Sequence, residues 1–139
     1  AYAEMFSGLD EDPGAHVERA FDVGHSEMVL VRDIPLYSVC EHHLLPFFGE
    51  VHLAYLPHEG KVAGFGKFSR LVDTLARRPQ LQERLTQQIA AAIEEDLSAE
   101  GVMAIVSAQQ LCMMMRGARA HGAQTTTSAS CGIFRTDPK

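Results

Sequence analysis

Metal-ligand side chains cluster at positions 40 to 43 of the sequence. Cys40, His42 and His43 place one thiol and two imidazoles within four positions, where an apolar stretch gives way to a loop. A second thiol, Cys112, lies far downstream in a strand-like stretch. Two thiolates and one imidazole are typical ligands of tetrahedral Zn²⁺, and three protein ligands leave a fourth position for water. These residue types therefore indicate a catalytic zinc centre.

Each of these residues could also have a purely structural role. Adjacent histidines are often a polar pair at the surface, and an isolated cysteine in a strand is usually a small core residue. From spacing alone, the two interpretations are evenly balanced. Cys131 is the third cysteine, and an odd number without an export signal argues against a disulfide framework.

The composition is that of one globular domain over residues 1–139. The chain is 46% hydrophobic and 22% charged, which supplies enough apolar material for a single core. No apolar run approaches the roughly 18 to 20 residues needed to cross a bilayer, and the start does not read as a signal peptide. We therefore expect a cytoplasmic protein that does not engage a membrane. The net charge of -6 is unfavourable for a nonspecific grip on nucleic acid.

Hydrophobic patterns predict strands in the first part of the chain. Residues 28–31 form a β-branched apolar run that suits a strand buried on both faces, and pairing should weaken at Pro35. A second strand follows Pro46, where alternation places three apolar residues on one face: Val51, Leu53 and Tyr55.

The remaining patterns predict two helices and two more strands. One helix is expected over 68–76, and Pro79 suits the first turn of the next. That second helix buries a stripe with a spacing of four residues: Leu81, Leu85, Ile89, Ile93 and Leu97. Strands follow over 102–115 and 125–134. The order predicts an α+β fold, with helices packed on one face of an antiparallel sheet.

Several segments, in order along the chain, resemble the GTP cyclohydrolase I family. The match runs from Met5 onward and is far more specific than any single motif. The matching segments are Ser38-Val39-Cys40-Glu41-His42-His43 with Pro46 and Phe47, Gly64-Phe65-Gly66-Lys67, Arg78 to Thr86, Cys112 to Gly117, Thr125 to Ser128 and Gly132 to Arg135.

The resemblance implies a fold, an assembly and a metal site. The fold is the tunnelling fold, in which subunits form a ring-shaped homodecamer with active sites at subunit boundaries. Cys40, His43 and Cys112 correspond to the family's zinc ligands, whereas Cys131 matches none and is interpreted as a core residue. We also expect that residues 1–139 do not include the helical segments that family members carry before its start and after its end.

The implied reaction is zinc-dependent hydrolysis of the guanine imidazole ring of GTP. It releases formate and gives dihydroneopterin triphosphate, the first step of folate and pterin biosynthesis. His42 is interpreted as a general acid/base, because each step needs proton transfers. The alternative is that His42 only orients a metal ligand by hydrogen bonding.

The resemblance also implies the groups that hold GTP. Glu83, with Gln82 beside it, corresponds to the carboxylate that binds the guanine edge. Lys67, Arg70 and Arg116 correspond to triphosphate contacts, and guanidinium groups can hold phosphate oxygens bidentately. Any one of the three would otherwise be an ordinary solvated surface charge.

Two positions depart from the family pattern. Gln110 occupies the catalytic position of a histidine, and an amide can hydrogen-bond but cannot act as an acid or base near neutral pH. Gly66 occupies the position of a serine. We consider three outcomes: the full reaction at reduced rate, a reaction that stops at the ring-opened formamide, or a substitution that traps substrate. His121, in a loop, is a candidate replacement proton carrier, although a surface loop histidine is the simpler interpretation.

Other classes of function make different predictions. A binding or regulatory protein would keep the purine pocket without turnover, and a structural zinc protein would supply four protein ligands. Pyruvoyl-tetrahydropterin synthases and nitrile-reducing queuosine enzymes share the tunnelling fold, but the Cys-Glu-His-His and Cys-Met-Met-Met-Arg-Gly segments resemble neither.

Overall fold

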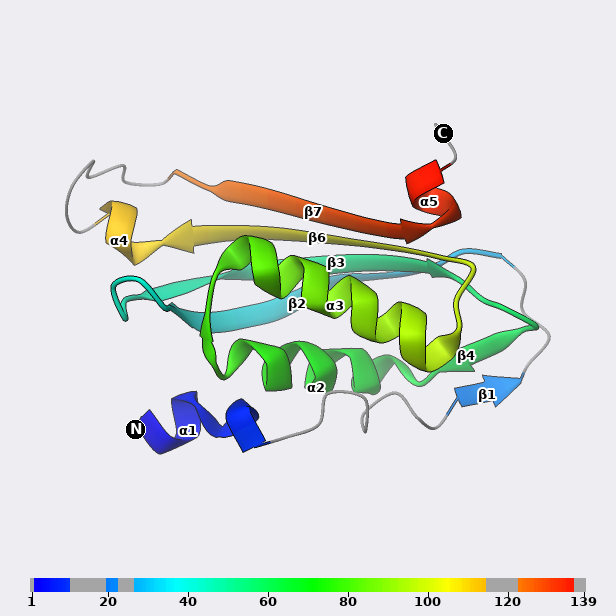
Figure 1. Cartoon of the computed structure of the whole chain (residues 1–139), viewed down its shortest axis with the longest axis horizontal. Helices are drawn as coiled ribbons and strands as arrows, with labels where there is room; N and C mark the ends of the chain where they lie inside the picture. Colours follow the sequence, from blue (N-terminus) through cyan, green and yellow to red (C-terminus); the bar gives the residue numbers. More distant parts are fainter. Residues whose placement is uncertain (1, 11–19, 23–26, 115–122, 137–139) are drawn as a thin grey trace.

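The computed structural model describes residues 2–10, 20–22, 27–114 and 123–136. Most of their strands form one main sheet, and the two longest helices lie on one of its faces (Figure 1). In chain order these elements are α1 (Tyr2–Met5), the 3-10 turn η1 (Ser7–Asp10), β1 (Ala20–Asp22), β2 (Val29–Cys40), β3 (Pro46–Leu56), β4 (Lys61–Ala63), α2 (Phe65–Ala76), β5 (Pro79–Gln80), α3 (Gln82–Leu97), β6 (Gly101–Gln110), α4 (Leu111–Met114), β7 (Thr125–Gly132) and α5 (Ile133–Thr136).

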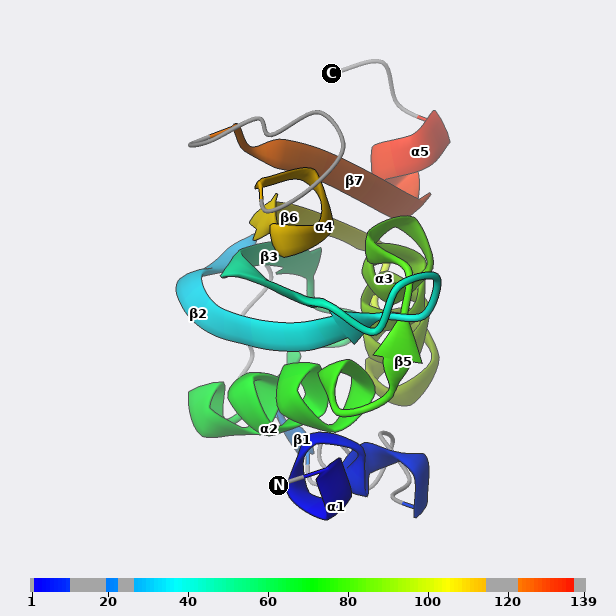
Figure 2. The ribbon, with the colours of Figure 1, turned by 90° about the vertical axis from the view of Figure 1, so that its left-hand side faces the viewer.

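The main sheet has the strand order β5-β2-β3-β6-β7, and a separate pair joins β1 to β4. β2, β3, β6 and β7 are antiparallel neighbours, whereas β5 runs parallel to β2. The sheet is curled, and α2 and α3 cover one of its faces (Figure 2). This arrangement confirms the predicted α+β fold with two helices on one face of an antiparallel sheet.

The hydrophobic core lies between that sheet face and the two helices. Val51, Leu53 and Tyr55 of β3 are at most 1% exposed, as their alternation predicts. From α3, the predicted stripe faces them: Leu85, Ile89, Ile93 and Leu97 are buried. In the part of the chain that the structure describes, no helix is long and apolar enough to cross a membrane.

The first long strand differs from its prediction. β2 continues through Pro35, which pairs with Glu50. Because β5 pairs with β2 only at Val39 and Cys40, Pro35 lies beyond that short contact, at an edge where its missing N–H breaks no ladder bond. The expectation that residues 28–31 are buried on both faces is wrong, since Leu30 is 54% exposed.

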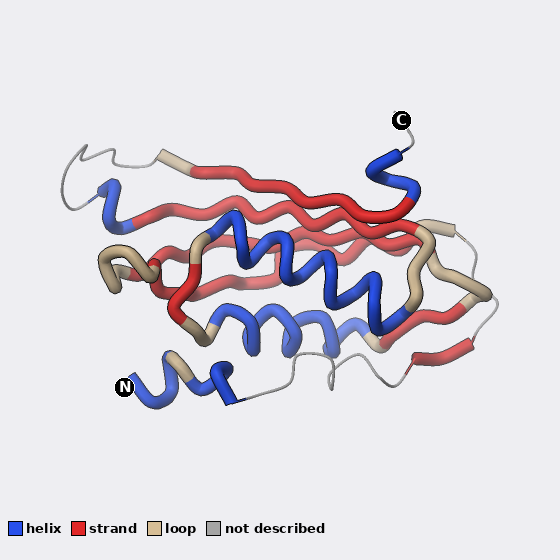
Figure 3. The backbone as a smooth tube through the Cα atoms, viewed as in Figure 1, coloured by secondary structure: helices blue, strands red, loops and turns tan. Residues whose placement is uncertain are grey.

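Two element boundaries in the second half also differ. Pro79 lies in β5, so α3 begins only at Gln82 (Figure 3). β5 pairs Pro79 with Val39 and Gln80 with Cys40, which places the start of α3 beside the end of β2. The strand expected over 102–115 ends at Gln110, and α4 follows at once. Cys112 therefore lies in a helical turn instead of a strand.

Candidate active site

Three of the predicted metal ligands converge at one end of the sheet. The Sγ atoms of Cys40 and Cys112 and one ring nitrogen of His43 all lie within 4.8 Å of one another. Cys40 ends β2 and His43 lies in the turn that follows. Phe47, near the start of β3, pairs with Gln110 at the end of β6. This register carries α4 and Cys112 to the same end of the sheet as the β2–β3 turn (Figure 1).

Main-chain hydrogen bonds shape the turn that holds Cys40 and His43. The Cys40 N–H donates to Leu45 O at 2.9 Å, and the Leu44 N–H donates to Cys40 O at 2.8 Å. Leu44 adopts a left-handed conformation with φ 54°, which closes the turn. The Glu41 N–H donates to Gln80 O at 2.9 Å. The turn is thus fixed both within itself and to β5.

A pocket of about 240 Å³ adjoins these ligands. Cys40 and Cys112 line it together with four residues of predicted function: His42, Gln82, Glu83 and Gln110. The rings of His42 and His43 are 6.2 Å apart and nearly perpendicular, at 83°. The two adjacent imidazoles therefore point in different directions: His43 contributes to the ligand cluster, and His42 lines the pocket. Other lining residues are Phe47, Leu81, Met113 and Thr125.

Gln82 is buried, and its amide is engaged by protein groups. Its Nε2 lies 2.8 Å from Thr125 O and 3.2 Å from Val106 O. Its Oε1 accepts a 2.7 Å hydrogen bond from Nε2 of Gln110. Gln82 therefore binds both strands beneath the pocket. Sequence reasoning missed this role, because its partners are backbone carbonyls that leave no trace in a motif.

Two of the predicted phosphate ligands are not brought to this pocket. Lys67 and Arg70 lie in α2, and neither lines it. The hydroxyl of Ser38 donates to Ala76 O at 2.7 Å, so α2 approaches Cys40 with its last turn. At 1.5 Å per residue, Lys67 lies about 14 Å further along the helix. The start of α2 lies beside β4, at the opposite end of the sheet from α4 (Figure 1). Arg116 and His121 fall outside the described residues.

The two departures from the family pattern are also separated within this chain. Gln110 lines the pocket, whereas Gly66 lies in the first turn of α2 beside Lys67. A Cβ added at Gly66 would meet no atom within 4 Å. Only Gln110 therefore alters the pocket formed by this chain.

A second group of ligand-type side chains is explained by hydrogen bonding. Asp33, Glu50 and His52 also place one atom each within 4.8 Å. The Asp33 N–H donates to Nδ1 of His52 at 3.0 Å, so the Nδ1 lone pair is occupied. In the neutral ring Nε2 then carries the proton, and it faces Glu50 Oε2 at 3.8 Å. This arrangement leaves no imidazole lone pair for a metal.

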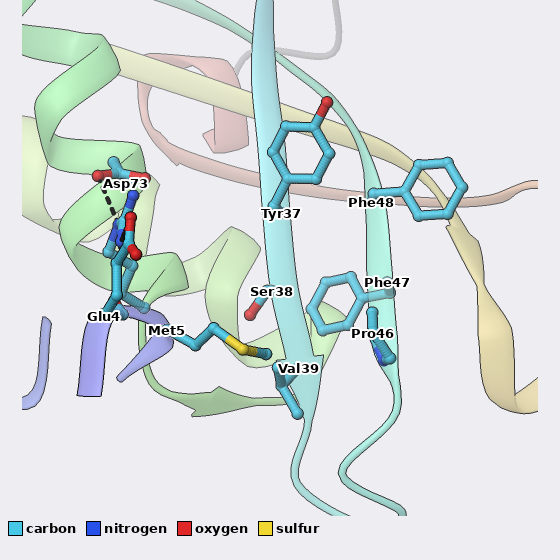
Figure 4. A pocket seen from close by; sticks show the side chains of 10 residues that line it. Glu4, Met5, Tyr37, Ser38, Val39, Pro46, Phe47, Phe48 and Asp73 are labelled. Carbon is cyan, nitrogen blue, oxygen red and sulfur yellow. Dashed lines mark hydrogen bonds and ion pairs between the residues drawn. The ribbon is translucent and has the colours of Figure 1, made fainter. Parts of the chain in front are cut away.

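A larger cavity of about 470 Å³ lies between the N-terminal segment and β2 (Figure 4). Tyr37 and Phe48 lie at one side of it, and Glu4 and Asp73 lie at the other. Arg77 already binds Asp73 at 2.8 Å and Glu4 at 3.9 Å. The described residues that line this cavity form no convergent ligand set, so the smaller pocket is the candidate active site.

Cys131, the third cysteine, lies away from the ligand cluster. It is half-buried in β7 and packs against the core. Burial raises the pKa of its thiol, Glu94 raises it further, and Arg135 partly offsets both effects. A raised pKa disfavours the thiolate that metal binding requires.

Comparison with known structures identifies the fold. The archaeosine synthase QueF-Like, in its apo form, superposes with a TM-score of 0.62 over 78% of this chain and 96% of that chain, at 21% identity. At this identity the likeness concerns the fold alone. The chain has the tunnelling fold.

Sequence comparison identifies the family. The model of the family described as GTP cyclohydrolase I matches residues 1–139. A GTP cyclohydrolase 1 of Carboxydothermus hydrogenoformans is 57% identical over 135 residues, covering 97% of this chain and 70% of that protein. A GTP cyclohydrolase 1 of Geobacillus kaustophilus is 55% identical over 136 residues, covering 98% and 72%. The chain belongs to the GTP cyclohydrolase I family.

Proposed function

We propose that this protein is a zinc-dependent GTP cyclohydrolase that opens the imidazole ring of guanine and releases formate. The observation that carries the proposal is the convergence of Cys40, His43 and Cys112 within 4.8 Å, beside a pocket lined by His42 and Glu83. The relatives named GTP cyclohydrolase 1 support the same reaction. Its product, dihydroneopterin triphosphate, would enter folate and pterin biosynthesis.

The three side chains fit a zinc ion. Ligand atoms at about 2.0 to 2.3 Å from one tetrahedral ion lie roughly 3.4 to 3.8 Å apart. The observed atoms all lie within 4.8 Å of one another, so modest side-chain rotations bring them to that spacing. When bound, zinc supplies a Lewis acid that lowers the pKa of a coordinated water towards neutrality. The three protein ligands leave a position for that water.

The other pocket residues supply proton transfer and recognition. His42 can accept a proton at one ring nitrogen and return it as the purine ring opens. Glu83 lies in the first turn of α3, where its carboxylate can accept hydrogen bonds from the ring N–H and amino group of guanine. Charge-assisted bonds of this kind are stronger than neutral ones.

The triphosphate must lie outside this pocket. A volume of about 240 Å³ is below the roughly 300 to 1,000 Å³ of sites that enclose a drug-sized ligand. It suits the base alone. We propose that Lys67 and Arg70 reach the triphosphate from α2 of a neighbouring subunit, with Arg116 as a further contact. A ring-shaped homodecamer with sites at subunit boundaries would provide this arrangement.

Gln110 favours an alternative outcome at the same site. It lines the pocket but has no group that titrates near neutral pH. The reaction would then stop at the ring-opened formamidopyrimidine, or the protein would bind GTP without turnover. Hydration of the ring can draw its proton transfer from His42 beside the metal site and needs none from Gln110, so it is the step best supported.

One experiment tests the proposal. Zinc-loaded protein is incubated with GTP, products are identified by mass, and formate is measured. We expect a product that has gained water, with formate released if the reaction completes. Cys112→Ser should lose both zinc and activity, whereas Cys131→Ser, the matched control, should keep both. Unchanged GTP despite a full zinc content would overturn the enzymatic proposal and favour a binding protein.

A further inference from the structure

The orientation of the Gln82 amide is fixed by its surroundings. Gln82 is 3% exposed, and its Nε2 faces three acceptors: Thr125 O at 2.8 Å, Val106 O at 3.2 Å and Thr127 Oγ1 at 3.3 Å. Two of these are backbone carbonyls, which cannot donate. Only the NH₂ group can satisfy them, so the carbonyl oxygen of Gln82 must point the opposite way.

The orientation of the Gln82 amide determines the orientation of the Gln110 amide. The Gln82 Oε1 accepts a 2.7 Å hydrogen bond from Nε2 of Gln110. Since a carbonyl oxygen needs a donor, the NH₂ group of Gln110 must face Gln82. The Oε1 of Gln110 is then directed to the other side, where it lies 4.0 Å from Cys112 Sγ. Both residues line the pocket.

We propose that Gln82 is a positioning residue, which makes Gln110 present a fixed hydrogen-bond acceptor to the purine ring beside Cys112. The proposal rests on the proposed function and deepens it. It also revises the sequence-based expectation that Gln82 binds the guanine edge directly, because the described structure already commits its amide to protein partners.

A fixed acceptor discriminates between the substrate and the hydrated ring. In GTP the imidazole nitrogen N7 carries a lone pair and no proton, so it cannot donate to Gln110. Addition of water across the C8–N7 double bond places the hydroxyl on C8 and the proton on N7. The new N–H and O–H groups can each donate a hydrogen bond to Oε1 of Gln110. An interaction that is absent in bound GTP and forms as water adds is stronger in the transition state than in the substrate complex, so it raises kcat without tightening substrate binding.

The same chain of bonds would orient an imidazole at position 110. One ring nitrogen would donate to Gln82 Oε1, and the other would face the pocket as an acceptor. Gln110 therefore reproduces the hydrogen-bonding polarity of a neutral histidine without its capacity to move a proton. Gln110→His should add that capacity, but only while Gln82 fixes the ring.

The test compares Gln82→Met, Gln110→His and the double variant with wild type. Gln82→Met keeps the length of the side chain and removes the amide. We expect it to lower kcat for ring hydration about 10-fold or more, with KM for GTP changed by less than about threefold. Gln110→His should raise formate release, and Gln82→Met should abolish that gain. Gln109→His is the matched control, because Gln109 lies on the opposite face of β6.

The outcomes separate this inference from the proposed function. The absorption of Co²⁺-substituted protein should be the same in Gln82→Met and wild type, which shows an intact ligand set. An unchanged kcat, a rise in KM alone, or an undiminished gain in the double variant would overturn the positioning role. If no variant acts on GTP, the proposed function fails. In that case thermal unfolding of Gln82→Met, Gln110→Met and the double variant tests whether the two side chains are coupled. Additive Tm shifts would refute the coupling between Gln82 and Gln110, and non-additive shifts would support it.

Discussion

Arg84 of α3 donates a 2.6 Å hydrogen bond from Nη2 to Oε2 of Glu41, the residue that follows Cys40. The same guanidinium donates to Pro79 O at 3.1 Å and to Oε1 of Gln80 at 3.2 Å. One side chain therefore joins α3, β5 and the turn that carries Cys40 and His43. Both residues lie in segments that match the family, but the sequence assigned neither of them a role.

Replacing Arg84 by alanine should weaken metal binding more than it weakens the fold. Side chains that orient metal ligands typically affect affinity by about 10- to 100-fold, and we expect the lower end. The side chains of Arg84 and Glu41 are 40% and 33% exposed, so the ion pair itself should contribute less than about 1 kcal/mol to stability. Competition with a chromogenic chelator measures the zinc affinity. Arg77→Ala, which removes an ion pair to Asp73 away from the site, should leave that affinity unchanged.

Glu83→Gln should impair GTP binding without affecting zinc content. The carboxylate would become an amide that accepts one hydrogen bond in place of two, and a bond to a charged group contributes roughly 1.5 to 3 kcal/mol. We expect the dissociation constant for GTP, measured by calorimetry, to rise about 10- to 100-fold. Glu95→Gln removes an exposed carboxylate from the same helix and should have no effect. Equal losses in both variants would refute the role of Glu83.

Tyr55→Phe should remove part of the alkaline sensitivity of the fold. Tyr55 is fully buried, and burial raises the pKa of its phenol, only partly offset by the hydrogen bond from the Ala63 N–H. A raised pKa in the folded state means that stability is complete below the unfolded pKa of about 10 and falls as pH rises above it. Between the unfolded and the folded pKa of Tyr55, the free energy of unfolding should fall by roughly 1.4 kcal/mol per pH unit.

The measurement is the free energy of unfolding in urea from pH 8 to pH 11. In Tyr55→Phe, the free energy of unfolding should decline less steeply above about pH 10. The substitution also removes the 3.4 Å hydrogen bond from the Ala63 N–H to the Tyr55 hydroxyl. Tyr37→Phe is the control, since Tyr37 is 74% exposed and should leave the curve unaltered. A decline of equal steepness in all three proteins would contradict the prediction.

Gly66→Ser should be tolerated, whereas Gly49→Ser should not. A Cβ at Gly66 meets open space, but a Cβ at Gly49 would lie 2.0 Å from the backbone oxygen of Ser107 on the paired strand β6. We expect a change within about 0.5 kcal/mol for Gly66→Ser and a loss of more than about 3 kcal/mol for Gly49→Ser. Thermal unfolding provides the comparison. Destabilisation by serine at position 66 would show that this side of α2 is occupied in the assembled protein.

The elements with a strong hydrophobic period were predictable from the sequence. Leu85, Ile89 and Ile93 repeat every four residues, and all three are buried. The alternation of Val51, Leu53 and Tyr55 likewise fixed the buried face of β3. Pro79 was not predictable in this way, because proline suits a helix start and an edge strand equally well. The choice depends on pairing with Val39, which lies 40 positions earlier in the sequence.

In the candidate site, too, some features were visible in local sequence patterns, and others depended on residues far apart in the chain. The ligand types at Cys40, His43 and Cys112 were visible in the sequence, but the helical turn that carries Cys112 was not. Four residues, from Leu111 to Met114, are too few to establish a helical period. The hydrogen bonds of the Gln82 amide join residues up to 45 positions apart, so no local pattern could reveal them.

The turn from Cys40 to Leu45 is closed by its own backbone bonds and by β5. Little ordering of the chain should therefore accompany the arrival of an ion, and its affinity is not diminished by that entropic cost. Chelation would empty this centre and leave the domain folded, ready to be reloaded. In this respect the protein would differ from zinc fingers, whose folding depends on the metal.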